Sequence, residues 1–302
     1  MEFVKKLKFK FKLLRKDYLY VLSRNRDFLI RSLLHNEKNY NNFDIDLAIV
    51  AIVKNEAPYI KEWIDFHKLV GVGRFYVYDN CSSDNLYNVL KEYIDAGDVV
   101  YKYIEGNVMQ IPVYEMAIND YKYDVKYMAF IDADEFIVPN SKNTIMEVIQ
   151  EIEKEYNTVV DAIAINWKMF GYNNNYKKKD GLVIENYTKC VYPNKHVKSI
   201  INPRLFYATK TDPHHFVPLI GKHTINDNAE KMYGPFNEHP TYKKIQINHY
   251  WTKSYEEFIA KAKRGRSDTI QSYELPKYQG DYLSEIFDDS ILRFLPALND
   301  KK

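Results

Sequence analysis

The sequence predicts an α/β protein in which helices cover both faces of a mostly parallel central sheet. Short apolar runs of strand length alternate with longer segments whose apolar residues recur at helical spacing. Glycine, asparagine and aspartate residues separate these segments, as expected for turns. With 302 residues, of which 46% are hydrophobic, the chain can bury a substantial core. This alternation favours parallel strands with ligands bound at their carboxyl ends.

The first 45 residues form a basic amphipathic segment that differs from the rest of the chain. Lysines and arginines alternate there with apolar residues, without the continuous apolar run of a signal peptide or a membrane span. Residues 1–40 are expected either to contact an anionic membrane or to form an ordinary solvated helix. The distant Cys81 and Cys190 indicate a reducing compartment and no metal cluster. We therefore expect a cytoplasmic protein, located at the inner face of the membrane if the segment binds lipid.

The strands and helices of the first half follow in regular order. An apolar run at 47–53 predicts the first strand, and Pro58 suits the first turn of the next helix. The second strand ends at Asp79, before a turn of capping residues and a helical stripe that begins at Leu86. Gly97 ends this helix. The remaining elements predicted in this half are a strand at 98–104, a helix at 111–121 and a strand at 127–131.

The second half contains two clear strands, one at 162–167 and one near 245–249. A helix with an apolar stripe follows the second of them. We divide the chain into the basic segment 1–45, a main domain at 46–266 and a C-terminal helical extension at 267–302.

Polar residues cluster where three predicted strands end. The fourth strand leads directly into Asp132, Asp134 and Glu135. An Asp-x-Asp pair at a strand end supplies two oxygen ligands for Mg²⁺ or Mn²⁺, and substrate phosphates complete the shell. The alternative is that these carboxylates only cap a turn or a helix. The same sheet edge would carry Lys54, Asn55 and Glu56 after the first strand, and Asp79 and Asp84 after the second.

Composition and motifs exclude several other classes of protein. The 43 basic residues nearly balance the 41 acidic ones, so no overall field favours nucleic acid. The first strand is not followed by Gly-x-Gly-x-x-Gly, and the chain has no P-loop, which argues against a dinucleotide oxidoreductase or a P-loop enzyme. The sequence remains compatible with a nucleotide-binding site that uses neither of these motifs.

Three segments carry a family resemblance: residues 53–67, Tyr78-Asp-Asn-Cys-Ser-Ser-Asp84 and Phe130-Ile-Asp-Ala-Asp-Glu-Phe136. Together they resemble glycosyltransferase family 92 and its bacterial relatives in the family-2-like group, over about residues 47 to 265. The resemblance implies a GT-A fold for the main domain, a UDP-sugar donor, and manganese or magnesium. It also implies residue roles: Asn55, Glu56 and Asp79 would face the nucleoside, Asp84 the uracil or ribose, and Asp132 and Asp134 the metal and diphosphate.

Further candidates match family positions in the second half. His249 ends its strand where GT-A enzymes commonly take another metal ligand; the alternative is a hydrogen-bonded histidine that closes the strand. Lys261 and Arg264 would neutralise the donor diphosphate, or merely stabilise the end of their helix. Trp167 and His215 match the acceptor side, where an indole face stacks on sugar; the alternative for Trp167 is core packing.

The expected reaction is one in-line displacement with inversion, in which a carboxylate takes the proton of the acceptor hydroxyl. Asp212 and Glu238 are the candidate bases, with Glu238 slightly favoured because glycine and proline bound its loop. Lys198 and His214 also match family positions.

The resemblance thus implies a metal-dependent glycosyltransferase. It would move a sugar, galactose in the known eukaryotic members, from a UDP-sugar to a carbohydrate or lipid-linked glycan such as lipopolysaccharide or capsule. One alternative is a haloacid-dehalogenase-like phosphatase, whose Asp-x-Asp normally follows its first strand and continues with Thr or Val where Phe136 stands here. A non-catalytic carbohydrate-binding protein is the other.

Overall fold

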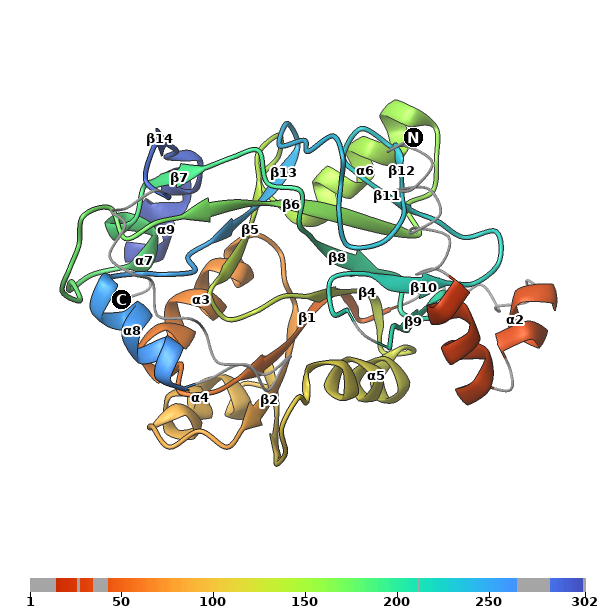
Figure 1. The fold of residues 1–302 in the computed structure, drawn as a ribbon, viewed down its shortest axis with the longest axis horizontal. Coiled ribbons are helices and arrows are strands. Elements are labelled where there is room, and N and C mark those ends of the chain that lie inside the picture. Colours follow the sequence, from red (N-terminus) through yellow and green to blue (C-terminus); the bar gives the residue numbers. More distant parts are fainter. Residues whose placement is uncertain (1–14, 26–27, 35–42, 211, 265–282, 301–302) are drawn as a thin grey trace.

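The computed structural model describes residues 15–25, 28–34, 43–210, 212–264 and 283–300. One large mixed sheet runs through the molecule, with helices on both of its faces (Figure 1). The predicted α/β class, a mostly parallel sheet flanked by helices, is confirmed.

The first half of the chain forms the parallel part of the sheet. Its four strands lie in the order β3-β2-β1-β4, and each neighbouring pair is parallel. One helix connects each strand to the next along the chain, as the alternating pattern predicted. The strands are β1 (Ile45–Val53), β2 (Arg74–Asn80), β3 (Val99–Ile104) and β4 (Val125–Phe130), and the helices are α3 (Ala57–Leu69), α4 (Leu86–Asp95) and α5 (Gln110–Tyr121).

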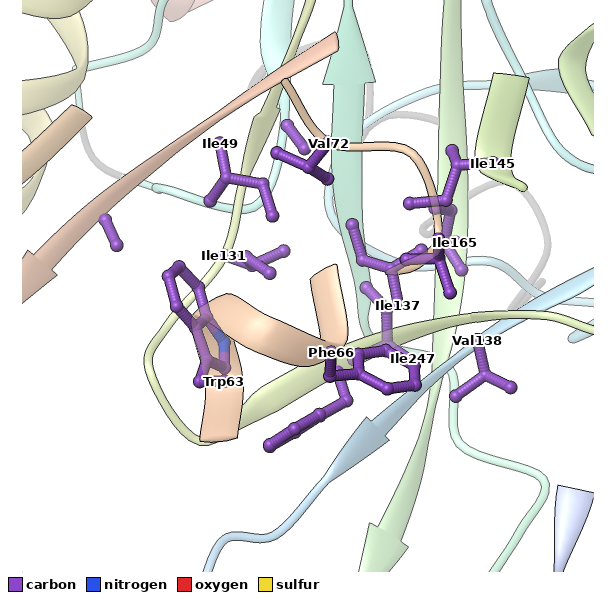
Figure 2. Packing of buried hydrophobic residues seen from close by; sticks show 14 of the residues in the cluster. Ile49, Trp63, Phe66, Val72, Ile131, Ile137, Val138, Ile145, Ile165 and Ile247 are labelled. Carbon is purple, nitrogen blue, oxygen red and sulfur yellow. The ribbon is translucent and has the colours of Figure 1, made fainter. Parts of the chain in front are cut away.

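Strand β1 is apolar from Leu47 to Val53 because both of its faces are buried there. Successive side chains of a strand point to opposite faces, so its residues divide between two cores. Leu47, Ile49 and Ala51 belong to the core beneath α3, α4 and α6 (Ile145–Tyr156), whereas Ala48 and Val50 belong to the core beneath α5. Figure 2 shows part of the first core, where Trp63 and Phe66 of α3 pack among isoleucine and valine side chains. Burial of this kind stabilises a fold by roughly 25 cal/mol per Å² of apolar surface.

The helix boundaries follow from local sequence signals. Pro58 occupies the first turn of α3, as predicted, and Gly71, with φ +96°, lies just after its end. Helix α6 begins with a capping box, in which the Thr144 side chain and Glu147 each accept a backbone N–H of the other. Asn157 ends it in the left-handed conformation.

The second half extends the sheet with strands that run in mixed directions. Strand β8 is antiparallel to both β4 and β6, and β13 is inserted between β5 and β6. In the antiparallel pair of β13 and β5, His249 lies opposite Glu135. The strands concerned are β5 (Glu135–Pro139), β6 (Ala162–Phe170), β8 (Val197–Ile201) and β13 (Ile245–His249).

Shorter elements complete the domain. Helix α8 (Tyr255–Arg264) follows β13, and residues from the C-terminal elements, including Ile291, Phe294 and Leu298, belong to the core beneath α3. The predicted domain boundaries stay predictions. The other elements are α2 (Phe28–Leu34), α7 (Val183–Asn186), β7 (Lys189–Val191), β9 (Phe206–Ala208), β10 (Phe216–Pro218), β11 (Thr224–Ile225), β12 (Lys231–Met232), β14 (Ile286–Phe287), η1 (Ser290–Phe294) and α9 (Leu295–Asn299).

Candidate active site

The Asp-x-Asp segment lies where the parallel strands end, and three strands fix its position. Strand β4 ends at Phe130, the loop carries Asp132 and Asp134, and β5 begins at Glu135. The backbone N–H of Tyr250, just after β13, donates to the carbonyl of Asp134 at 2.9 Å. Glu135 in turn accepts the backbone N–H of Asp132 through Oε2 at 2.8 Å. The loop is therefore held rigidly against the end of β13.

Asp134 and His249 lie next to each other at this position. Oδ2 of Asp134 is 3.7 Å from Nε2 of His249 and also pairs with the ammonium group of Lys261. Burial raises the pKa of Asp134, but Lys261 and His249 outweigh it and hold that pKa well below its usual range. Burial lowers the pKa of His249, which Asp134 only partly offsets, so burial favours the neutral imidazole. An ionised carboxylate beside a neutral imidazole is a pair of donors that can bind a divalent ion.

Asp132 has different partners. Its Oδ2 accepts from Nζ of Lys198 at 2.8 Å, and its Oδ1 accepts from Nε2 of Gln110 at 2.9 Å. The Lys198 side chain is fully buried, and Oε2 of Glu135 lies 3.6 Å from its Nζ. Burial alone would lower the pKa of Lys198. The carboxylates of Asp132 and Glu135 have the opposite and larger effect, so that pKa lies well above its usual range. Burial raises the pKa of Glu135 well above its usual range, which Lys198 only partly offsets.

The predicted nucleotide residues brace the loops after β1 and β2. Asn55 donates its N–H to the Ser82 hydroxyl at 2.9 Å and accepts the N–H of Ser83 at 2.7 Å. Asp79 accepts the N–H of Ser82 at 2.8 Å and the Tyr101 hydroxyl at 2.7 Å. These contacts show that the two loops meet at one edge of the sheet, as predicted.

Asp84, Glu56 and Lys54 occupy the same edge. Asp84 accepts the backbone N–H of Ala57 at 2.9 Å, so it joins the second loop to the start of α3. Glu56 is buried and pairs with Nζ of Lys253 at 3.3 Å, while Lys54 is exposed. Lys253 also helps to lower the pKa of Asp134, which places its charge near the Asp-x-Asp loop. The binding roles predicted for these residues stay predictions.

An aromatic wall adjoins the Asp134–His249 pair. The Trp167 ring is stacked on His196 at 5.1 Å and meets the rings of His249 at 4.5 Å and His214 at 5.3 Å edge to face. Only 9% of Trp167 is exposed, and among the described residues its Nε1 has no hydrogen-bond partner. Trp167 is therefore packed in the core, which was the alternative predicted for it. Its ring also contacts that of His249, the predicted metal ligand.

The two candidate bases lie in different surroundings. Asp212 accepts Nδ1–H of His214 at 2.9 Å, and His214 is the histidine whose ring meets Trp167. Glu238 lies on the surface, where it pairs with Lys195 at 2.8 Å. His215 lies behind Asp212, with Nε2 3.3 Å from Asp17. Asp212 is thus linked to the site through His214 and Trp167.

Burial raises the pKa of Asp212, but hydrogen bonds from His214 and His215 outweigh it and lower that pKa below its usual range. Asp212 alone is therefore a weak base near neutral pH.

Helix α8 supplies Lys261, whereas the side chain of Arg264 lies outside the described residues. Sequence reasoning gave no role to Gln110, Lys198 or Lys253. The signal for Lys198 was a charged residue in a short, fully buried strand in which only Ser199 is also polar. Lys253 has a positive φ of 50°, which the sequence does not reveal.

Comparisons with known proteins show which family the chain resembles. The model of glycosyltransferase family 92 matches residues 49–283. A family 92 protein of Ricinus communis is 25% identical over 220 residues, which are 72% of this chain and 37% of the relative. One of Oryza sativa subsp. japonica is 24% identical over 215 residues, which are 70% of this chain and 34% of the relative. The chain thus spans about a third of the length of these curated relatives.

Among solved structures, Staphylococcus aureus TarS 1–349 in complex with UDP-GlcNAc is similar with a TM-score of 0.37 and 13% identity. The match covers 52% of this chain and 45% of TarS 1–349, and a score this low does not bear on function. The family model, in contrast, covers most of the chain, including the Asp-x-Asp loop and His249. The chain therefore belongs to glycosyltransferase family 92.

Proposed function

We propose that this protein is a metal-dependent, inverting glycosyltransferase that transfers a sugar from a UDP-sugar to a carbohydrate acceptor. The observation that carries the proposal is Oδ2 of Asp134 lying 3.7 Å from Nε2 of His249, at a sheet edge where Lys198, Lys253 and Lys261 gather. Such an edge suits a divalent ion and a diphosphate together. Family membership supports sugar transfer as the reaction.

Asp134 and His249 would hold the ion. Among the described residues, no three His, Cys, Asp or Glu side chains are arranged to hold a metal by themselves. The pair fits an ion that takes its remaining ligands from diphosphate and water, which is how Mg²⁺ is usually bound. When bound, the ion would neutralise charge on the leaving diphosphate. Asp132, one third exposed, would face the donor beside it.

The lysines would bind the donor diphosphate. Lys261 reaches Asp134 from α8 on a long, flexible side chain, so it can move to a phosphate oxygen when a cation takes over the carboxylate. Lys198 is buried and fixed by Asp132, so it contributes a stationary positive charge. Preorganised positive charge of this kind stabilises a leaving group without reorganisation during the reaction.

We place the base at the pair of Asp212 and His214. The acceptor hydroxyl oxygen would bond to the anomeric carbon while the bond from that carbon to the diphosphate oxygen breaks. The hydroxyl proton would pass to Nε2 of His214, because Nδ1 is engaged by Asp212, and the Asp212 carboxylate would stabilise the imidazolium. An α-linked donor would then give a β-linked product.

Turnover of nucleotide sugars tests the proposed function. We expect the full chain to hydrolyse or transfer from a UDP-sugar, with UDP-galactose tested first, in a reaction that requires Mn²⁺ or Mg²⁺. Proton NMR of the product should show a β-anomeric coupling. Release of phosphate from simple phosphomonoesters, without turnover of any UDP-sugar, would instead indicate a haloacid-dehalogenase-like phosphatase. Metal-independent sugar binding without turnover would indicate a non-catalytic carbohydrate-binding protein.

We also propose that the N-terminal region brings the enzyme to an anionic membrane, where a lipid-linked acceptor would be met. Helix α2 packs inward through Phe28, whose ring is 5.4 Å from that of Tyr207. Its other face exposes Leu29 at 50%, Ile30 at 59% and Leu33 at 76%. The basic residues of the preceding segment, 1–14, lie outside the described residues, and no helix within the described part is long and apolar enough to cross a membrane. Contact of α2 with the membrane surface agrees with its exposed apolar face and with the lack of a spanning helix in the described part.

Serine substitution of Leu29, Ile30 and Leu33 is expected to weaken binding to anionic liposomes at low salt, while UDP-sugar hydrolysis is retained. Each buried CH₂ contributes about 0.8 kcal/mol to such binding. The matched control replaces three similarly exposed residues elsewhere, Val159, Ile220 and Phe287, with serine. Co-sedimentation measures the effect. Equal sedimentation of both triple variants and the unchanged protein would refute membrane contact through α2.

A further inference from the structure

Two buried polar atoms face each other beside the proposed metal ligands without a hydrogen bond. Nδ1 of His249 and Oε1 of Glu135 lie 3.8 Å apart, and among the described residues neither has a hydrogen-bond partner. The Glu135 side chain is completely buried and that of His249 is 7% exposed. A buried polar atom without a partner costs free energy, so unpaired atoms of this kind call for an explanation.

The neighbouring contacts show which atoms of His249 and Glu135 can form a hydrogen bond with each other. The other oxygen of Glu135, Oε2, is fixed by the N–H of Asp132 at 2.8 Å, and the other nitrogen of His249, Nε2, points at Asp134. His249 and Glu135 are opposite residues in the β13–β5 pair, so the backbone already holds their side chains side by side. A shift of roughly 1 Å would bring the two atoms within the usual hydrogen-bond distance.

We infer that Glu135 is a positioning residue for His249: its Oε1 accepts Nδ1–H and so leaves the lone pair of Nε2 free to bind the divalent ion. The inference rests on the proposed function, because it presupposes that His249 binds a metal. A histidine ligand commonly donates its other N–H to a carboxylate or carbonyl, which fixes the tautomer and the ring orientation. An ionised Glu135 can accept through both oxygens, Oε2 from the N–H of Asp132 and Oε1 from Nδ1–H of His249.

Replacement of Glu135 with glutamine should reverse this hydrogen bond. The N–H of Asp132 requires an acceptor, so the amide oxygen of the new side chain takes that place and its NH₂ group faces His249. Nδ1 would then accept, the ring hydrogen would move to Nε2, and the metal-binding lone pair would be lost. Glutamine has nearly the size of glutamate, so the change tests the hydrogen-bond direction rather than packing.

We expect Glu135→Gln to weaken Mn²⁺ binding in the presence of UDP by about 10- to 100-fold, as measured by calorimetry. Nitrogen NMR of the full chain with Mg²⁺ and UDP should show His249 as the Nδ1–H tautomer in the unchanged protein and as Nε2–H in the variant. Glu62→Gln is the matched control, because Glu62 is a partly buried carboxyl group that also accepts backbone N–H groups, from Val183 and Ile184. It should leave the Mn²⁺ affinity unchanged.

Unchanged Mn²⁺ affinity in Glu135→Gln, or an Nε2–H tautomer of His249 in the metal-loaded unchanged protein, would overturn the inference. The second measurement requires no variant, so it remains decisive if Glu135→Gln does not fold. Failure of the unchanged protein to bind Mn²⁺ at all would be a different result. It would contradict the proposed function itself, and the role of Glu135 with it.

Discussion

Replacing Asp134 with asparagine is expected to lower metal-dependent turnover of UDP-sugar by about 100-fold or more. Asparagine keeps the size of the side chain but removes the negative charge that, with His249, would hold the ion. Loss of a group that only holds a metal ligand in place costs 10- to 100-fold in metal affinity, and loss of the ligand itself should cost at least as much. Initial rates at saturating Mn²⁺, together with the Mn²⁺ concentration required for half-maximal rate, measure the effect.

The matched control for this change is Asp288→Asn. Asp288 is also buried and also pairs with a buried lysine, Lys168, at 2.5 Å. Removing either carboxylate leaves an ammonium group, of the partly buried Lys261 or the buried Lys168, without its ion-pair partner, so both variants should be less stable to heat. Only Asp134→Asn should lose turnover per folded molecule. If both variants keep the original turnover, Asp134 is not a metal ligand.

Replacement of Asp212 with asparagine is expected to lower kcat by about 10²- to 10⁴-fold, with donor affinity little changed. The asparagine can no longer stabilise a positive charge on His214, so the histidine becomes a poorer proton acceptor. Glu238→Gln is the direct comparison, because Glu238 is the other candidate carboxylate and pairs with Lys195 on the surface. We expect that variant to retain most of the activity.

Steady-state kinetics of the two variants, with UDP affinity measured in parallel, distinguishes the two candidate bases. A large loss of kcat in Glu238→Gln and none in Asp212→Asn would move the base to the loop around Glu238. A loss in donor affinity that accounts for the whole effect in Asp212→Asn would show that this residue supports binding instead.

The parallel half of the fold could be predicted from the sequence because its signals are local. Strand β1 reads as one apolar run because both faces are buried, and Pro58 and Gly71 mark the helix that follows. Predicted strand and helix boundaries differ from the observed ones by one to three residues, as with β6, which continues to Phe170. Element ends depend on tertiary contacts, so local patterns do not fix them.

The arrangement of the site depends on long-range pairing that no local pattern contains. Insertion of β13 between β5 and β6 brings His249 opposite Glu135, more than 100 positions earlier in the chain. The contact of Lys198 with Asp132 likewise requires β8 to lie against β4. Sequence reasoning named His249 from the family resemblance but could not assign Lys198 a partner.

Calorimetric titration of UDP into the full chain, with Mn²⁺ and with a chelator, tests the proposed function most directly. We predict that Mn²⁺ strengthens UDP binding at least about tenfold in the unchanged protein, because Asp134 and His249 would hold the ion and its charge would attract the diphosphate. In Asp134→Asn the two affinities should become nearly equal. Equal UDP affinity with and without Mn²⁺ in the unchanged protein would contradict a metal-dependent nucleotide-sugar site at this sheet edge.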